Sequence, residues 1–145
     1  MTEIDRSLGR RWFEEVWNKG RREAIGEMLP PDCAIHDRGL KPIGSDGLFQ
    51  FFDRMRDTFS DIHIEVNQSI AEDNLLCVRW SCTAKHTGDG LDGVAPTGRT
   101  INVTGITIFQ VADGIVVEAW QNWDMLGMME QIQNPHSRAA TYIRA

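Results

Sequence analysis

The chain is poor in three features that would each define a class of protein. It has three cysteines, Cys33, Cys77 and Cys82, and an odd number without disulfide-type spacing is typical of reduced thiols in a reducing compartment. No hydrophobic run approaches the roughly 20 residues that a membrane span needs. Residues 1–11 are polar and lack the apolar stretch of a signal peptide. We therefore expect a cytoplasmic protein that binds no membrane.

Positive charge is also scarce. The sequence has 15 Lys and Arg residues against 21 Asp and Glu residues, which gives a formal net charge of −6. The densest basic stretch, residues 10–22, is diluted by Glu14 and Glu15 and is typical of the solvated face of a helix. A nucleic-acid-binding protein usually presents a basic stripe. The charge balance therefore argues against a nucleic-acid partner.

What remains is the composition of an ordinary globular domain. Hydrophobic residues make up 41% and charged residues 25% of the 145 residues, which is close to the average for soluble proteins. Two domains of half this length would each have a marginal core. We predict one domain over residues 1–133, followed by a weakly patterned tail over residues 134–145.

The N-terminal part of the sequence has helical periodicity. Leu8, Trp12 and Val16 recur every four residues, and Gly20 is a natural end for this helix. Pro30 and Pro31 stop a second helix, and Ser45 can cap a third. The predicted elements are helices over residues 2–20, 21–29 and 45–58, with a short strand over residues 33–37.

From residue 62 onward the hydrophobic period changes from helical spacing to strict alternation, which predicts strands. Asp113-Gly114 is a strong two-residue hairpin signal. Helices followed by hairpin-linked strands predict an α+β fold. We expect a cone-shaped, curved antiparallel sheet packed on the N-terminal helices around an internal apolar pocket. The predicted strands cover residues 62–71, 75–87, 100–111 and 115–124, and a last helix covers residues 125–132.

Two motifs resemble ligand sites, but their context indicates structural roles. Residues 88–93 match the glycine pattern of dinucleotide-binding loops, but they join two antiparallel strands and no helix follows, so a hairpin loop is favoured. Cys77, Cys82 and His86 cannot share one metal ion, because strand alternation places Cys77 on the opposite face. We expect neither a metal nor a cofactor.

The end of the last strand is the most suggestive segment. Alternation places Glu118, Trp120, Asn122 and Asp124 on one face. If this face lines a cavity, burial would raise the pKa of Asp124 toward neutrality and suit it to proton transfer. Alternatively, Asp124 only caps the helix that follows. The pattern leaves both readings open.

A second candidate lies at the end of the first strand. His36 and Asp37 are adjacent, so only one of them can point inward, and a strand-end turn is the alternative role for Asp37. Because Trp80, Phe52 and Met55 occur in the hydrophobic patterns of the long strand and the third helix, we expect them to contact a ligand together with Trp120 and Asn122.

Several segments together resemble the SnoaL-like polyketide cyclases, a family within the nuclear transport factor two-like superfamily. The resemblance covers about residues 8–132. The segments that carry it are RWFEEVWNKG (residues 11–20), PDCAIHD (31–37), KHTGDGLDGVAPTG (85–98), GITIFQVADG (105–114) and EAWQNWD (118–124).

This resemblance implies an α+β cone with a deep apolar pocket. It also implies intramolecular aldol condensation of a polyketide ester without metal or cofactor. The family's acid/base aspartate would be Asp124, and its pocket histidine would be His86 or His36. Asp37 is similar to the position of the general base of ketosteroid isomerase, a member of the same superfamily.

We therefore expect a cofactor-free enzyme that acts on a small apolar carbonyl compound. Asp124 would remove a proton next to the carbonyl, and Asn122, the indole N–H of Trp120 or His86 would hold the enolate. The alternatives are a non-catalytic binding module, an isomerase, dehydratase or epoxide hydrolase, and a structural dimer whose pocket is filled by its own side chains.

A homodimer is expected as well. The strand faces that carry Ile106 and Ile108, or Val117 and Ala119, are more apolar than a water-exposed surface usually is.

Overall fold

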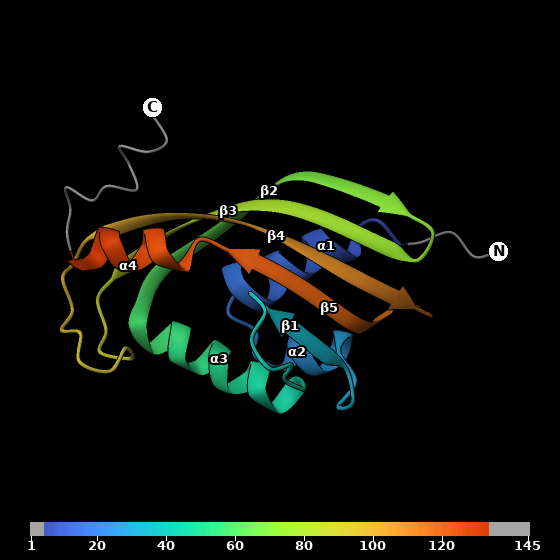
Figure 1. Ribbon diagram of the computed structural model, residues 1–145, viewed down its shortest axis with the longest axis horizontal. Helices are drawn as coiled ribbons and strands as arrows, with labels where there is room; N and C mark the ends of the chain where they lie inside the picture. The colour runs from blue at the N-terminus through green and yellow to red at the C-terminus, as the bar shows by residue number, and fades with distance from the viewer. Residues whose placement is uncertain (1–4, 134–145) are drawn as a thin grey trace.

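The computed structural model describes residues 5–133 of the chain (Figure 1). The proposed N-terminal turn of the first helix and the tail over residues 134–145 therefore lie outside the described residues. The helices are α1 (Leu8–Arg11), the π-helix η1 (Trp12–Asn18), α2 (Glu23–Met28), α3 (Ser45–Thr58) and α4 (Met125–Gln133), and the strands are β1 (Ala34–Asp37), β2 (Phe59–Glu72), β3 (Leu75–His86), β4 (Thr100–Ala112) and β5 (Ile115–Trp123).

The five strands form one sheet in the order β1-β5-β4-β3-β2. The pairs β2–β3, β3–β4 and β4–β5 are antiparallel, as the hairpin signals predict. The β1–β5 pair is parallel, so the expected antiparallel sheet has one parallel pair at this edge. A parallel pair needs a long connection, and here α3 and three strands separate the two partners in the chain. The fold class is α+β, as predicted, with a mixed and mostly antiparallel sheet.

Helices α1, α2 and α3 lie on one side of the sheet (Figure 1). We call the sheet face toward them the inner face and the opposite face the outer face. The inner-face residues of β3 predicted by alternation, among them Val78, Trp80, Ala84 and His86, are buried. No helix among residues 5–133 is long and apolar enough to cross a membrane.

The first helix differs from the single α-helix that was predicted. It changes from α to π geometry at Trp12, and at its end the N–H of Lys19 donates to the carbonyl oxygen of Glu14 five residues earlier, at 2.9 Å. An α turn carries residues at four-residue spacing one way around the helix axis, and the wider π turn that begins at Trp12 carries them back, so Leu8, Trp12 and Val16 stay on one face. All three side chains are buried in consequence.

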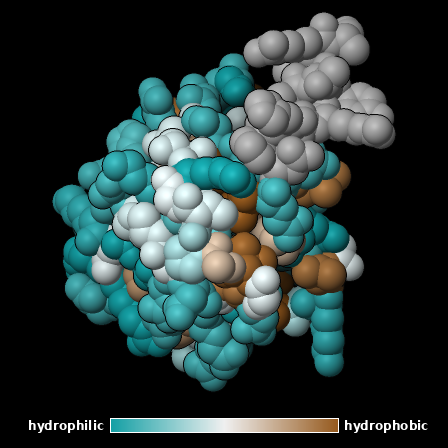
Figure 2. Space-filling model, turned by 90° about the vertical axis from the view of Figure 1, so that its left-hand side faces the viewer, coloured by the Kyte–Doolittle hydropathy of each residue, from teal (hydrophilic) through white to brown (hydrophobic). Residues whose placement is uncertain are grey.

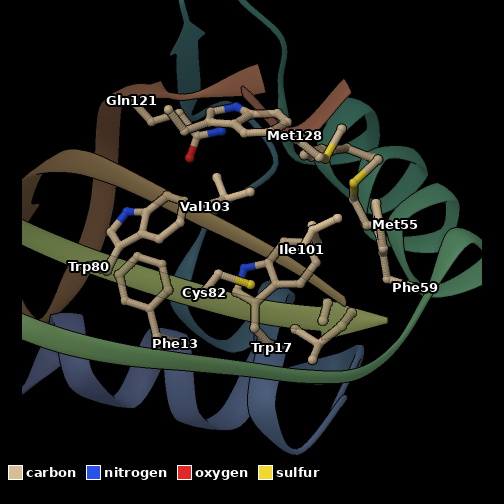
Figure 3. Close-up of a pocket in the computed structure, with 14 residues that line it drawn as sticks. Phe13, Trp17, Met55, Phe59, Trp80, Cys82, Ile101, Val103, Gln121 and Met128 are labelled. Atoms are coloured by element: carbon tan, nitrogen blue, oxygen red, sulfur yellow. The ribbon is translucent and has the colours of Figure 1, made fainter. Parts of the chain in front are cut away.

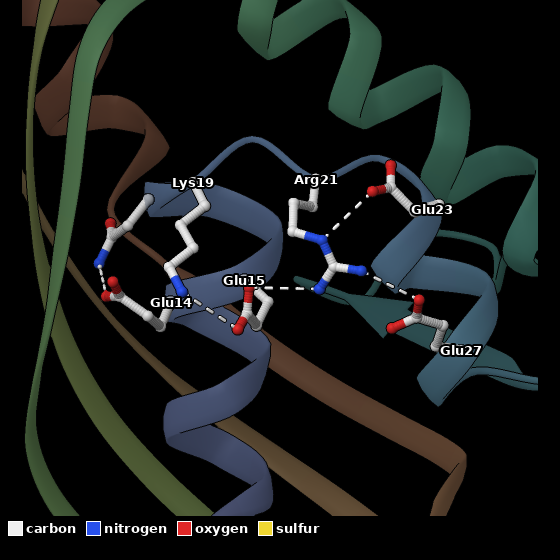
Figure 4. Close-up of polar contacts among 7 residues, drawn as sticks. Glu14, Glu15, Lys19, Arg21, Glu23 and Glu27 are labelled. Carbon is white, nitrogen blue, oxygen red and sulfur yellow. Dashed lines mark hydrogen bonds and ion pairs between the residues drawn. The ribbon is translucent and has the colours of Figure 1, made fainter.

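The end of η1 is tied to α2 by a surface network of charges (Figure 4). Arg21 donates to Glu15, Glu23 and Glu27 at 3.0–3.3 Å, and Lys19 also contacts Glu15. The hydrogen bond from Arg21 is the main cause that lowers the pKa of Glu15. Exposed pairs of this kind contribute little stability individually. Their effect here is to fix the direction in which the chain leaves η1.

Strand β2 begins at Phe59, three residues before the predicted start, directly after α3. The early part of this strand escaped prediction because the pairing with β3 is irregular between Ser60 and His63. Asp61 has a left-handed backbone there, with φ of 51°. A bulge of this kind interrupts the alternation on which the prediction depended.

The glycine-rich segment between β3 and β4 is a loop, as predicted, and it packs on the end of α3. The N–H of Gly88 donates to the carbonyl oxygen of Thr58 at 2.9 Å. A Cβ atom on Gly88 would overlap the carbonyl oxygen of Asp57, so this close approach of two backbones requires glycine. Gly88 therefore allows the loop to pack closely against the end of α3, and the glycine-rich segment does not begin a helix.

Candidate functional site

A cavity of about 90 Å³ lies between the inner face of the sheet and the helices (Figure 3). Its walls are almost entirely apolar, and aromatic and methionine side chains dominate them. Figure 2 shows a hydrophobic patch among hydrophilic neighbours on the end of the molecule that carries α4. The lining residues are Phe13, Trp17, Phe51, Met55, Phe59, Ile62, Trp80, Cys82, Ala84, Ile101, Val103, Gln121, Trp123 and Met128.

Trp80, predicted to contact a ligand, lines one wall of the cavity. Its indole N–H donates to the hydroxyl of Thr107 at 3.0 Å, and its ring centroid lies 5.6 Å from that of Phe13. Gly105 lies directly opposite on β4, and a Cβ atom there would overlap the indole. The missing side chain of Gly105 thus allows Trp80 to lie close to the sheet, and a neighbouring hydroxyl satisfies its one polar atom.

The few polar groups in the wall come from β5. The carboxamide of Gln121 points into the cavity (Figure 3). The indole N–H of Trp123 is buried and has no hydrogen-bond partner among residues 5–133. A buried donor without a partner costs about 1–3 kcal/mol. Such an atom in a cavity wall is a candidate to bind a ligand oxygen.

A carboxylate lies beside these groups at the end of β1. Asp37 is the register partner of Gln121, and it shares a strand face with the buried Ile35, so it belongs to the inner face. Arg38 donates to both carboxylate oxygens of Asp37, at 3.0 and 3.1 Å. The same guanidinium lies 5.1 Å from the ring centroid of Trp123. One arginine therefore connects the carboxylate to the cavity wall.

The predicted orientation of β5 was wrong. Glu118, Trp120 and Asn122 lie on the outer face, whereas Gln121 and Trp123 line the cavity. Either set of alternate residues contains a tryptophan, so the sequence pattern did not distinguish the two faces. The distinguishing signal was the small apolar Ala119, which is buried against the sheet core and fixes the inward set.

Asp124 is exposed and caps α4. Its Oδ1 accepts a hydrogen bond from the backbone N–H of Gly127 at 2.8 Å, as an N-cap residue does. The sequence left two roles open for Asp124, proton transfer and helix capping, and this geometry is that of a helix cap. This placement gives no support to Asp124 as the buried acid/base group.

Substituting Asp124 by Ala should therefore lower the free energy of unfolding by about 1 kcal/mol, since the capping hydrogen bond is lost. Urea titration followed by circular dichroism measures this change. Asp124→Asn keeps a capping oxygen and should lose much less. Equal stability of the wild type and Asp124→Ala would contradict the capping role.

His36 and Trp120 contact each other on the outer face. Their rings are stacked, with centroids 5.5 Å apart and planes inclined by 7°, and His36 Nε2 lies 2.7 Å from a carboxylate oxygen of Glu118. Neither residue reaches the cavity. Of the two adjacent candidates on β1, Asp37 is thus the one on the inner face.

His86 is fully buried on the inner face, and its ring packs against Phe59. Its Nδ1 accepts the backbone N–H of Thr97 at 3.3 Å and lies 3.0 Å from the Thr97 hydroxyl. Its Nε2 is buried without a partner among the described residues. Burial lowers the pKa of His86 from its ordinary value of 6.5, because the charged ring would lose its hydration.

This lowered pKa makes folding pH-dependent. Below about pH 6.5 the unfolded chain binds a proton at His86 before the folded protein does, so stability should fall by up to about 1 kcal/mol per pH unit as the pH decreases. Urea unfolding at pH 7, 6 and 5 measures the slope. His86→Phe removes the titrating group and should reduce that slope. An unchanged slope would show that His86 is not the source.

Two residues of α3 were predicted to contact a ligand, and only one of them lines the cavity. Met55 lines the cavity, whereas Phe52 is buried against Trp17 and does not, and Phe51 lines the cavity instead. Cys82 also lines the cavity, and burial raises the pKa of its thiol to about 11. A thiol with this pKa stays protonated near neutral pH, so Cys82 contributes apolar surface and no nucleophile.

The described residues contain no group of three or more His, Cys, Asp or Glu side chains that could hold a metal ion.

The sequence matches the family model for SnoaL-like polyketide cyclase over residues 7–132. The chain belongs to the SnoaL-like polyketide cyclase family. The fold is that of the nuclear transport factor two-like superfamily. Among curated proteins no match is found.

Solved structures of this family and fold agree with the assignment. A protein from Jannaschia sp. CCS1 named as a SnoaL-like polyketide cyclase is 25% identical, with a TM-score of 0.79, over 88% of this chain and 90% of that chain. IdmH from Streptomyces antibioticus, named as a polyketide cyclase, is 26% identical, with a TM-score of 0.73, over 82% of this chain and 91% of that chain. AclR from Streptomyces galilaeus, named as a hydroxylase, is 25% identical, with a TM-score of 0.74, over 81% and 86%.

Proposed function

We propose that this SnoaL-like protein binds a small, largely apolar carbonyl compound in its cavity and forms an enolate from it by acid/base chemistry. The observation that carries the proposal is the position of the polar groups. The carboxamide of Gln121 and the unpartnered N–H of Trp123 belong to the lining of an otherwise apolar cavity, and the carboxylate of Asp37 lies just outside that lining, on the neighbouring strand in register with Gln121.

These three groups match the two needs of enolate formation. Asp37 would accept the proton of the C–H bond next to the carbonyl, and the electron pair of that bond would move to the carbonyl oxygen. The N–H of Trp123 and the amide N–H of Gln121 would donate hydrogen bonds to this oxygen as its negative charge develops. Donors fixed before the reaction need little rearrangement during it.

The enolate carbon then has two possible partners. Attack on a second carbonyl of the same molecule forms a C–C bond and closes a ring, and the second oxygen takes up a proton. Return of the proton to a different carbon instead gives an isomer. Family membership favours the ring closure. In both cases the apolar walls exclude water, which would otherwise compete for the proton and weaken the hydrogen bonds to the oxygen.

Medium-chain β-keto esters test the proposal, since their acidic C–H bond reports enolate formation. Binding is followed by quenching of tryptophan fluorescence, and enolate formation by deuterium uptake from D2O in NMR spectra. We expect the wild type to bind and to accelerate exchange, and Asp37→Asn to bind without accelerating it. Exchange at equal rates with both proteins would refute the role of Asp37.

The placement of Asp124 favours a second candidate, a non-catalytic binding module, because the aspartate that the family resemblance assigns to acid/base chemistry is exposed and caps α4. The cavity of about 90 Å³ is small beside most ligand sites, so a ligand needs movement of the flexible side chains of Met55 and Met128. Binding of the β-keto esters without any exchange above the uncatalysed rate would support this candidate.

A further inference from the structure

Arg38 occupies a backbone position that few residue types favour. It belongs to a tight turn, closed by a hydrogen bond from the N–H of Leu40 to the carbonyl oxygen of Asp37 at 2.9 Å. Both central residues have a left-handed backbone, with φ of 51° at Arg38 and 74° at Gly39. A turn of this kind favours asparagine, aspartate or glycine at its first central position. The turn itself therefore does not explain the long arginine side chain.

The turn brings the guanidinium of Arg38 to the end of β5 that lines the cavity. Its backbone N–H donates to the carbonyl oxygen of Gln121 at 3.0 Å, and the carboxamide of Gln121 points into the cavity (Figure 3). The centre of the guanidinium lies 5.1 Å from the ring centroid of Trp123, which also lines the cavity. Arg38 thus lies just outside the lining, as Asp37 does.

One edge of this guanidinium has no strong hydrogen-bond acceptor. Asp37 takes the first edge, which is formed by Nε and Nη2. The second edge is formed by Nη1 and Nη2, and among residues 5–133 Nη1 donates only to the sulfur of Met125, at 2.8 Å. A thioether sulfur is a weak acceptor. A guanidinium has five N–H groups, and these contacts use three of them.

Arg38 is also less exposed than the other arginines that pair with carboxylates in the described part of the chain. Its side chain is 29% exposed, against 37% to 53% for Arg11, Arg21 and Arg22. Water and salt screen a charge less where it is partly buried. A negative group on the second edge of Arg38 would therefore be attracted more strongly than one on the surface.

Two groups with free donors lie close together at this end of the cavity. One is the second edge of Arg38, and the other is the N–H of Trp123, which is buried without a partner among the described residues. The planar edge of a guanidinium matches the two oxygens of a carboxylate. A single N–H matches a single carbonyl oxygen. The pair suits a ligand in which a short spacer joins a carboxylate to a carbonyl group.

We infer that the substrate of this cavity carries a carboxylate near its reacting carbonyl group, and that the second edge of Arg38 binds this carboxylate. The inference rests on the proposed function, because it names the class of carbonyl compound that the cavity takes. The family resemblance implies an ester, which has no charge to offer Arg38. With the carboxylate on Arg38 and the carbonyl on Trp123, the C–H bond between them would lie near Asp37, which shares the same guanidinium.

Succinylacetone tests the inference, because it is a β-diketone that ends in a carboxylate, and its methyl ester is the neutral match. Binding of both compounds to the full chain is measured by quenching of tryptophan fluorescence at about pH 7, where the carboxyl group is ionised. We expect the wild type to bind the acid about tenfold more tightly than the ester, because only the acid forms charge-assisted hydrogen bonds with Arg38. Equal affinities would overturn the inference.

Arg38→Asn removes the guanidinium and places at the turn a residue that its left-handed backbone favours, so this variant should fold. It should lose the preference for the acid. Arg22→Asn is the matched control. Arg22 also donates to both oxygens of a carboxylate, that of Asp53, and lies 4.6 Å from the ring centroid of Phe49, but it is exposed and away from the cavity lining. The control should keep the preference, and a loss in both variants or in neither would contradict the role of Arg38.

Asp37→Asn separates a binding role of Arg38 from a purely structural one. The substitution removes a negative charge beside the second edge of the guanidinium. The acid should therefore bind about threefold more tightly than it binds the wild type, while the ester gains nothing. If Arg38 served only to hold Asp37 in place, the affinity for the acid would not rise.

The same two ligands keep this inference separate from the proposed chemistry. If the ester binds and exchanges deuterium through Asp37 but the acid binds no better, the enolate chemistry stands and the carboxylate site is refuted. If Arg38 confers a preference for the acid but neither ligand exchanges faster than in buffer, the carboxylate site stands and the enolate chemistry is refuted. Failure of both ligands to bind refutes both.

Discussion

Asp37→Asn is expected to lower the turnover of a competent carbonyl substrate by about 10² to 10⁴-fold, the usual contribution of a general acid or base. The asparagine side chain has nearly the same shape and can still accept a hydrogen bond from Arg38. It lacks the charge and the basicity needed to take a proton. Substrate binding should therefore stay within a few-fold of the wild type, and the loss should appear in kcat.

The control is Asp124→Asn, because the family resemblance implied Asp124 as the acid/base aspartate. In the structure this residue is exposed and bonded to Gly127. Its substitution should leave kcat unchanged. A large loss with Asp124→Asn and none with Asp37→Asn would reverse our assignment and restore the expectation from the sequence.

Trp80→Ala should produce the largest loss of stability, about 3–5 kcal/mol. Trp80 is buried, packs against Phe13 and bonds the hydroxyl of Thr107. Removing the indole leaves a large void beside the cavity and a buried hydroxyl without its donor. Trp80→Phe keeps most of the packing and loses only the hydrogen bond, so its cost should be near 1–2 kcal/mol. Urea unfolding of the three proteins measures both values.

Ligand affinity separates the two tryptophans that sequence analysis grouped together. Trp80 lines the cavity, whereas Trp120 lies on the outer face against His36. Trp80→Phe should weaken the binding of a β-keto ester, and Trp120→Phe should leave it unchanged. The opposite result would mean that the ligand binds the outer face.

The arrangement of helices and strands was largely predictable, because the spacing of hydrophobic residues along the chain differs between a helix and a strand. The change from helical spacing to alternation after α3 predicted the four long strands, and α3 itself was placed correctly over residues 45–58. The π turn in η1 and the bulge near Asp61 were not predictable, since each changes the local period that the prediction uses. The parallel pairing of β1 was missed because no local signal distinguishes it.

The candidate site was less predictable than the fold. A cavity wall depends on which alternate residues of a strand face inward, and a shift of one residue exchanges Trp120 for Trp123. On α3 a shift of one residue likewise separates the predicted Phe52 from Phe51, which lines the cavity. Membership of the family did not resolve these choices, because a motif fixes the order of residues along a strand but not the direction in which each one points.

The π-helix makes the length of this segment a structural constraint. Each residue of an α-helix advances the chain by about 100° around the axis. Deletion of a single residue between Trp12 and Asn18 would let the segment relax into a uniform α-helix and would turn everything before it by that angle. Leu8, now fully buried, would then rotate toward solvent. This stretch should therefore tolerate substitutions at its exposed positions but not a change in length.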